Sequence, residues 1–214
     1  MAIEIANGNV FLSANGSGSL TITLQFSNPV TEGNRLVCRA VSIPGSPSCS
    51  DGTDAWEEHV TQGDASDGVY VVGIFSHIVT AIQDGTMPTV TITTDYGGDP
   101  ADVNLVISLI ELSGADAVTA LDGVAVSATG TGGGPAVTDI GEITTTVDGD
   151  YFVGVFYSDN GVGALDVSNS TLIYEGQELL ISAGTGRAFF GAIDQFTFEP
   201  FSPNLLLDNA GQAY

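Results

Sequence analysis

Lysine is absent from this chain of 214 residues, and its basic residues are Arg35, Arg39 and Arg187 against 26 acidic ones. The formal net charge is −23. Nucleic-acid binding needs basic side chains that neutralise phosphates, and anionic membrane surfaces attract basic segments. The composition therefore excludes nucleic acid and anionic membranes as partners. Because 43% of the residues are apolar, we expect the acidic residues to lie on a folded body rather than in a disordered chain.

Targeting signals are also lacking. The first residues carry no basic segment followed by an apolar run, as a signal peptide would, and no stretch reaches the roughly 18 apolar residues of a membrane helix. We therefore expect synthesis in a host cytoplasm, without the general export route. The two cysteines, Cys38 and Cys49, are too few for a disulfide framework, and we expect them to be small buried apolar side chains.

Helical periodicity is nearly absent from the sequence. Runs rich in Val, Ile, Thr, Tyr and Phe recur between clusters of turn residues, a pattern typical of strands. The sequence therefore predicts an all-β fold, an antiparallel two-sheet sandwich of jelly-roll type. The strands are expected at about 8–14, 18–27, 34–43, 54–60, 69–81, 88–95, 102–112, 122–129, 138–147, 150–158, 171–175, 178–183 and 187–199.

Two kinds of strand can be distinguished. Residues 18–27 and 89–94 alternate between apolar and polar, as in a strand with one face in solvent, whereas 69–75, 105–110 and 151–157 are apolar on both faces. Strands of the second kind need cover on the side away from the sandwich core. Loops of the same chain, a terminal arm or a neighbouring subunit would each provide it.

The C-terminal residues 201–214 differ from the predicted strands before them. We expect one sandwich domain over residues 1–200 and an arm over 201–214, because two prolines after the last predicted strand interrupt any ladder. Leu205, Leu206, Leu207 and Tyr214 give this otherwise irregular tail an apolar surface. These four residues are the predicted interaction site.

No catalytic constellation stands out. His59 and His77 have no nucleophile motif beside them, and Glu57 and Glu58 would point to opposite faces of a strand, so they cannot form a facing carboxylate pair. We expect no enzymatic activity. Trp56, Tyr70, Tyr151 and Tyr157 are candidates for a sugar-stacking platform, but aromatic residues at strand spacing more often belong to the core.

Metal binding has weak support. Aspartates gather in the predicted loops, and Ca²⁺ takes oxygen ligands from such loops. Asp51 and Asp54 are the candidates, although Asp is also a favoured turn residue without any metal. We expect no cofactor and keep Ca²⁺ as an alternative.

The order of these segments resembles a jelly-roll-like β-sandwich module that recurs in structural proteins of tailed bacteriophages. The resemblance covers residues 1 to about 200, and it departs from the family in the acidity of the chain and in the tail. No single motif is specific, and the ordered set carries the likeness. The matching landmarks are 33–42, 50–56, 68–75, 88–93, 110–116 with 120–123, 148–154 and 188–200.

The resemblance implies a virion structural protein, and a module without fibre repeats is most similar to a capsid decoration, or cement, protein. Such a protein would bind the major capsid protein on the capsid exterior, as a homo-oligomer (trimer or dimer), and reinforce contacts between capsomers. The alternative is a carbohydrate- or receptor-binding tail component of a phage virion.

Overall fold

The described part of the chain consists of strands with turns and loops between them. The computed structural model describes residues 4–16, 19–43, 45–52, 56–63, 71–95, 103–116, 118, 136–139, 151–158, 162–167, 171–173, 179–180, 187–194 and 203–207. No helix occurs in these ranges, so none there is long and apolar enough to cross a membrane. Every strand pair is antiparallel, and the predicted all-β class is confirmed.

Fifteen strands are described. They are β1 (Glu4–Gly16), β2 (Leu20–Gln25), β3 (Arg35–Ile43), β4 (Ser46–Ser50), β5 (Glu57–Gly63), β6 (Val71–Ile78), β7 (Thr89–Asp95), β8 (Val103–Ser113), β9 (Ala136–Asp139), β10 (Tyr151–Ser158), β11 (Val162–Val167), β12 (Thr171–Ile173), β13 (Leu179–Leu180), β14 (Arg187–Asp194) and β15 (Pro203–Leu207). The predicted strand at 122–129 lies outside the described residues.

Contacts within the chain group it into two compact units, Met1–Ala120 and Leu121–Tyr214. The sequence-based division, a domain over 1–200 and an arm over 201–214, stays a prediction beside this grouping. The first unit contains β1 to β8 and the second contains β9 to β15.

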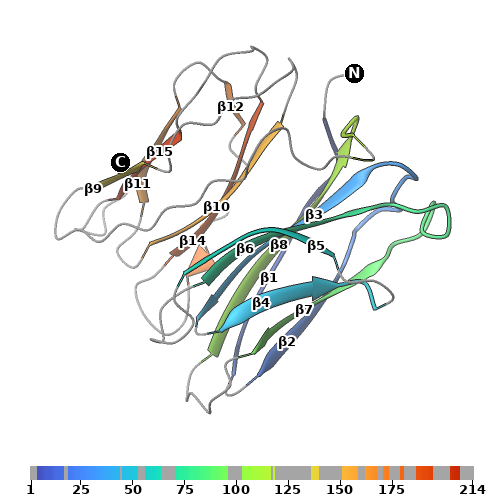
Figure 1. Cartoon of the computed structure of the whole chain (residues 1–214), viewed down its shortest axis with the longest axis horizontal. Helices are drawn as coiled ribbons and strands as arrows, with labels where there is room; N and C mark the ends of the chain where they lie inside the picture. The colour runs from blue at the N-terminus through green and yellow to red at the C-terminus, as the bar shows by residue number, and fades with distance from the viewer. Residues whose placement is uncertain are drawn as a thin grey trace. The chain divides into compact units, whose positions relative to one another are not determined.

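Two sheets make up the first unit. The larger has the order β1-β8-β3-β6-β5 and the smaller the order β2-β7-β4. The smaller sheet lies as a layer in front of the larger one (Figure 1). The predicted two-sheet antiparallel sandwich is thus present in this unit.

Alternation along each strand builds the core between the two sheets. In β2 and β7 the residues Ile22, Leu24, Val90 and Ile92 are buried while their neighbours are exposed or half-buried. Side chains from β3, β6 and β8 meet them from the larger sheet. The core cluster comprises Ile22, Leu24, Phe26, Val30, Leu36, Cys38, Ala40, Cys49, Trp56, Phe75, Val79, Val90, Ile92, Leu105, Ile107 and Leu109.

The other face of the larger sheet is also buried. Val37 and Val41 on β3 and Val106 and Ile110 on β8 are at most 4% exposed, which confirms the two-sided burial predicted for 105–110. Among the described residues the exposed large apolar side chains are Ile82, Met87 and Val118. These four side chains are therefore covered, whereas Val72 and Ile74 of β6 are half-buried.

The second unit has two small sheets. One has the order β10-β14-β12, with β13 also paired to β14, and the other has the order β11-β15-β9. The irregular course predicted for the tail is wrong for Pro203–Leu207, since β15 is the central strand of its sheet. Leu205 there is opposite Leu165 of β11 and Thr138 of β9.

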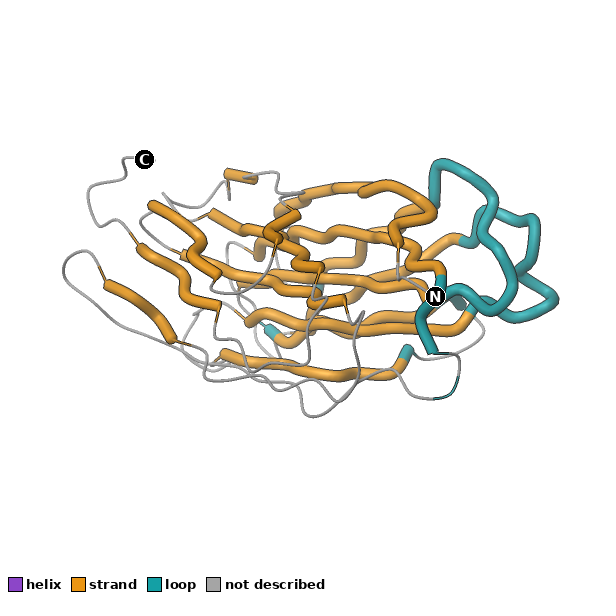
Figure 2. The backbone as a smooth tube through the Cα atoms, turned by 90° about the horizontal axis from the view of Figure 1, so that it is seen from above, coloured by secondary structure: helices purple, strands orange, loops and turns teal. Residues whose placement is uncertain are grey.

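Two long loops close one end of the first unit. Residues 26–34 and 79–88 lie side by side at that end of the strands (Figure 2). Backbone bonds join them: the Val30 amide donates to the Thr86 carbonyl (2.8 Å) and the Gly85 amide to the Val30 carbonyl (2.9 Å). Each loop thus holds the other in place.

Candidate functional site

The outward side of the β2-β7-β4 sheet is an exposed surface of eight hydroxyl-bearing side chains and Gln25, which we call the hydroxyl face. It arises because the apolar residues of β2, β7 and β4 alternate inward, which turns their polar neighbours outward. All nine of its residues are exposed or half-buried. They are Thr21, Thr23, Gln25, Ser46, Ser48, Ser50, Thr89, Thr91 and Thr93.

Strand register sets these hydroxyls in rows across the sheet. Thr93 is opposite both Thr21 and Ser48, and Thr91 is opposite both Thr23 and Ser50. The Oγ1 atoms of Thr21 and Thr93 are 3.1 Å apart, within hydrogen-bond distance. Neighbouring strands are about 4.8 Å apart, and alternate residues are about 6.7 Å apart along a strand. Because threonine is stiff at χ1, the surface is a largely preset grid of hydroxyl and methyl groups.

The nine residues of the hydroxyl face carry no charge. None of them is acidic or basic, in a chain with a formal net charge of −23. One acidic residue borders them, because Asp95, the last residue of β7, is opposite Ser46 of β4. A partner that covers the nine residues short of Asp95 meets hydrogen-bonding groups without having to desolvate a carboxylate. The face therefore suits a polar surface that carries little charge.

A second feature is a buried polar cluster that joins β3, β5 and β6. The Ser76 Oγ atom is 2.6 Å from Nε2 of His59 and accepts a hydrogen bond from Nη1 of Arg35 (2.9 Å). The His59 Nδ1 atom is 3.9 Å from a carboxylate oxygen of Glu57. The β5–β6 register shifts between Glu58 and Val60, so His59 lies at a bulge, a feature that re-aims side chains.

The cluster has the composition of a Ser-His-Glu triad but not its access or its geometry. Ser76 is 2% exposed, so its oxygen is not accessible to a substrate in this arrangement. The 3.9 Å separation between His59 and Glu57 is too long for an orienting hydrogen bond. Arg35 also donates through Nη2 to the Asp116 carbonyl (2.9 Å). The arrangement ties three strands together and satisfies the Ser76 hydroxyl.

His59 makes stability depend on pH in a defined window. Burial lowers the pKa of His59; Glu57 opposes this shift and Arg35 reinforces it. As the pH falls, His59 therefore takes up a proton in the unfolded chain before it does so in the folded one. The free energy of unfolding decreases as the pH drops from about 6.5 toward the lowered folded pKa. We expect His59→Gln, which stays neutral, to reduce this slope between roughly pH 7 and 5.5 in urea unfolding. An unchanged slope in the variant would contradict the assignment to His59.

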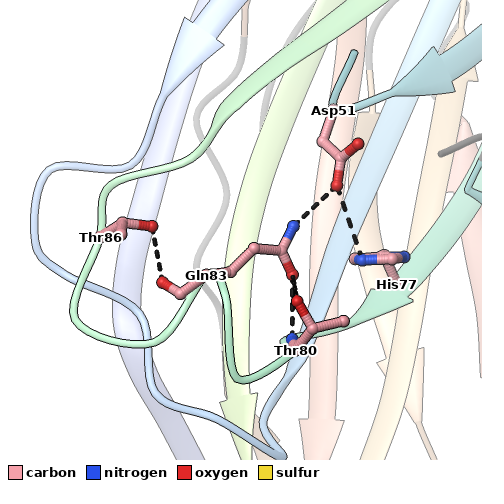
Figure 3. Close-up of polar contacts among 5 residues, drawn as sticks. All are labelled: Asp51, His77, Thr80, Gln83 and Thr86. Carbon is pink, nitrogen blue, oxygen red and sulfur yellow. Dashed lines mark hydrogen bonds and ion pairs between the residues drawn. The ribbon is translucent and has the colours of Figure 1, made fainter. Parts of the chain in front are cut away.

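A third cluster surrounds Asp51 (Figure 3). The Asp51 side chain is 3% exposed; its Oδ2 atom accepts a hydrogen bond from Nε2 of Gln83 (2.7 Å) and lies 3.6 Å from Nε2 of His77. The Gln83 Oε1 atom in turn accepts a hydrogen bond from the backbone amide of Thr80 (2.9 Å). The His77 ring stacks on Trp56 with centroids 5.8 Å apart. The cluster fastens the 79–88 loop to the sandwich.

The predicted calcium candidates do not come together as a metal site in the described residues. Asp51 faces nitrogen donors, whereas Ca²⁺ takes oxygen ligands, and Asp54 lies outside the described residues. The described part holds no group of three or more His, Cys, Asp or Glu residues placed for a metal ion. Absence of a cofactor stays a prediction.

The other candidates divide between buried and undescribed positions. Trp56 is 5% exposed, so it belongs to the core and offers no platform for sugar stacking. Leu205, Leu206 and Leu207 are in β15, and Tyr214 lies outside the described residues. Their role as an interaction site stays a prediction. The hydroxyl face was visible in the sequence only as alternation in 18–27 and 89–94.

Comparison with known proteins gives no relative from which a function could be transferred. No family model matches this chain, and neither a curated protein nor a solved structure matches it.

Proposed function

We propose that this chain is a non-catalytic virion structural protein, a capsid decoration protein that binds its shell through the hydroxyl face. The observation that carries the proposal is the hydroxyl face itself, an exposed sheet surface of nine uncharged residues bordered by Asp95. The apolar side chains of 105–110, one of the runs that first suggested assembly, are buried and offer no attachment surface, so we place attachment on a different one. The hydroxyl face supplies one whose residues are preset by strand register.

Strand order supports the resemblance to jelly-roll modules. In the first unit β1, β8, β3 and β6 form one sheet and β2, β7 and β4 the other, so that consecutive strands mostly alternate between sheets, as in a jelly roll. One strand departs from that order: β5 pairs with β6 rather than with β4. Jelly rolls occur in viral capsids and also in lectins, so strand order alone does not choose between these functions.

The chemistry of the surface supports a protein shell as the partner. Hydroxyl groups donate and accept hydrogen bonds, and a rigid face loses little side-chain entropy when it is covered. A shell formed by a major capsid protein would offer backbone and polar side-chain groups to such a surface. The acidic remainder of the chain, which disfavours nucleic acid and anionic membranes, would face the surroundings of the particle.

A carbohydrate- or receptor-binding tail component remains the second candidate, and the same hydroxyls favour it. Sugar binding through stacked aromatics is not supported at Trp56, whose ring is in the core. A glycan array distinguishes the two functions. Binding to one glycan class without binding to shells would replace the decoration proposal.

The test is co-sedimentation with shells assembled from the major capsid protein of the same genome. We expect Thr23→Arg, which places a charge on the hydroxyl face opposite Thr91 of the central strand, to weaken shell binding at least about tenfold, a loss of about 1.4 kcal/mol. Thr31→Arg adds the same charge in the 26–34 loop, away from this face, and should bind like the wild type. Equal binding by both variants would remove the hydroxyl face from the proposal.

A further inference from the structure

The two cysteines face one another across the sandwich. Cys38 is on β3 in the five-stranded sheet and Cys49 on β4 in the three-stranded sheet. Both belong to the core cluster that also contains Trp56. Cys38 is 0% and Cys49 6% exposed, and both are free thiols. Two strands of different sheets thus bring the only two thiols of the chain into the same apolar layer.

The corner between β3 and β4 explains why they meet. β3 ends at Ile43 and β4 begins at Ser46, and the turn uses Gly45 with a φ of 97°, a conformation that glycine adopts readily. The Ser42 hydroxyl donates to the Gly45 carbonyl and closes this corner. Cys38 is five residues before the end of β3 and Cys49 three residues after the start of β4, and the Cys38 side chain is near enough to raise the pKa of Cys49.

We propose that Cys38 and Cys49 are an oxidation site, and that they form a disulfide between the two sheets when the protein meets a small disulfide oxidant such as oxidised glutathione. One cysteine thiolate attacks the oxidant, forms a mixed disulfide and releases one glutathione thiol. The second thiolate then attacks the protein sulfur of the mixed disulfide and releases the second glutathione. Two cysteine thiols are oxidised, one glutathione disulfide is reduced to two thiols, and the two protons end on glutathione.

The surroundings of the thiols decide when this happens. Burial raises the pKa of Cys49, and the neighbouring Cys38 side chain adds to that shift, so little thiolate exists in the folded protein. Exchange needs thiolate and access. We therefore expect slow oxidation of the folded chain and fast oxidation during folding. A reducing cytoplasm would keep both thiols free, whereas an oxidising medium would favour the cross-link.

The cross-link would constrain the unfolded chain. Closure of the short loop between Cys38 and Cys49 removes conformations from the unfolded state, as disulfides generally do, and raises Tm by roughly 5–10 °C in a unit of this size. This effect is independent of what the hydroxyl face binds. A failed shell-binding test would therefore leave the oxidation site untouched, and the reverse also holds.

The positions of Arg35 and Arg39 allow trypsin to separate the two cysteines into different peptides. The full chain is refolded with oxidised glutathione, and a second sample is refolded with dithiothreitol; both are then alkylated, denatured and digested with trypsin. With no lysine in the chain, cleavage after Arg35 and Arg39 places Cys38 in the tetrapeptide Leu36–Arg39 and leaves Cys49 in the next fragment. We expect the tetrapeptide to be linked to that fragment in the first sample and to be released by reduction.

Thermal unfolding of the same two samples gives the second readout. The oxidised sample should have the higher Tm, and dithiothreitol added to the unfolded chain should abolish the difference. Cys38→Ser serves as the control, since its Tm should not respond to the oxidant. A free alkylated tetrapeptide, a tetrapeptide that carries glutathione, or an oxidised sample with unchanged or lower Tm would each overturn the proposal.

Discussion

Replacement of Phe75 by alanine is expected to lower the free energy of unfolding by about 3–5 kcal/mol, the range for large-to-small changes at buried aromatic sites. Phe75 is 2% exposed and lies in the core cluster between the two sheets. Its ring lies over Gly73 of the same strand, where an added Cβ would come within 2.8 Å of ring atom Cε2. Removal of the ring leaves a cavity that β6 and β4 cannot close without shifting.

The same geometry predicts coupling between Phe75 and Gly73. Gly73→Ala alone should cost about 1–3 kcal/mol by overpacking, since its methyl group would also come within 3.2 Å of Cγ of Pro47. In Gly73→Ala/Phe75→Ala the new methyl occupies part of the cavity, so the double variant should lose less than the sum of the single losses. Urea unfolding measures all three. Strict additivity would show that the two positions do not share this space.

A matched control comes from the surface of the same unit. Ile82 is 91% exposed in the 79–88 loop, so Ile82→Ala removes apolar atoms without creating a cavity and should change stability by less than about 0.5 kcal/mol. Comparable losses in Ile82→Ala and Phe75→Ala would mean that size, rather than core packing, determines the effect.

Much of the fold follows from alternation and apolar runs. The strands at 18–27, 34–43, 69–81, 88–95 and 102–112 were predicted near their observed positions, because their residues both favour strands and match a buried face. β4 was missed because Ser46, Pro47 and Ser48 have the composition of a turn. β15 was missed because its first residue is Pro203, although the first residue of a strand tolerates proline.

The polar clusters depend on register, which local sequence does not fix. Ser76 and His59 meet because β5 pairs with β6 and shifts register next to His59, and nothing in the sequence near His59 indicates this. Cys38 and Cys49 likewise meet only through the corner between β3 and β4. Residue type predicted that the cysteines would be buried, while their pairing required the arrangement of the sheets.

An apolar run in the sequence predicts that its side chains are buried, but it does not predict which part of the protein or which neighbouring subunit covers them. The stretch 105–110 was expected to need cover on both faces, and Ile107 and Ile110 are indeed both 0% exposed. The sequence left a neighbouring subunit and the same chain as alternatives, and these two side chains are covered without a second copy. The decoration proposal consequently moves from apolar strand faces to the hydroxyl face, where binding depends on hydrogen bonds and shape more than on apolar area.

The second large effect is expected at Glu111, whose replacement by leucine should lower the free energy of unfolding by about 2–4 kcal/mol because two donors of the 26–34 loop lose a buried carboxyl acceptor. Glu111 is 1% exposed, and its Oε1 atom accepts hydrogen bonds from the Thr31 amide (2.9 Å) and from Nδ2 of Asn34 (2.7 Å). Leucine fills similar space but leaves both donors without this oxygen. The side chain thus anchors the 26–34 loop to β8.

Glu111→Gln separates hydrogen bonding from shape, since its amide oxygen can still accept from Thr31, and we expect it to lose only about 1 kcal/mol. Urea unfolding gives the stabilities, and hydrogen exchange at the Thr31 amide reports the loop directly. Exchange there should accelerate strongly in Glu111→Leu and only slightly in Glu111→Gln. If both variants keep wild-type exchange at Thr31, then the backbone bonds to the 79–88 loop, such as Val30 to Thr86, are sufficient to hold the 26–34 loop, and the buried carboxylate is not its anchor.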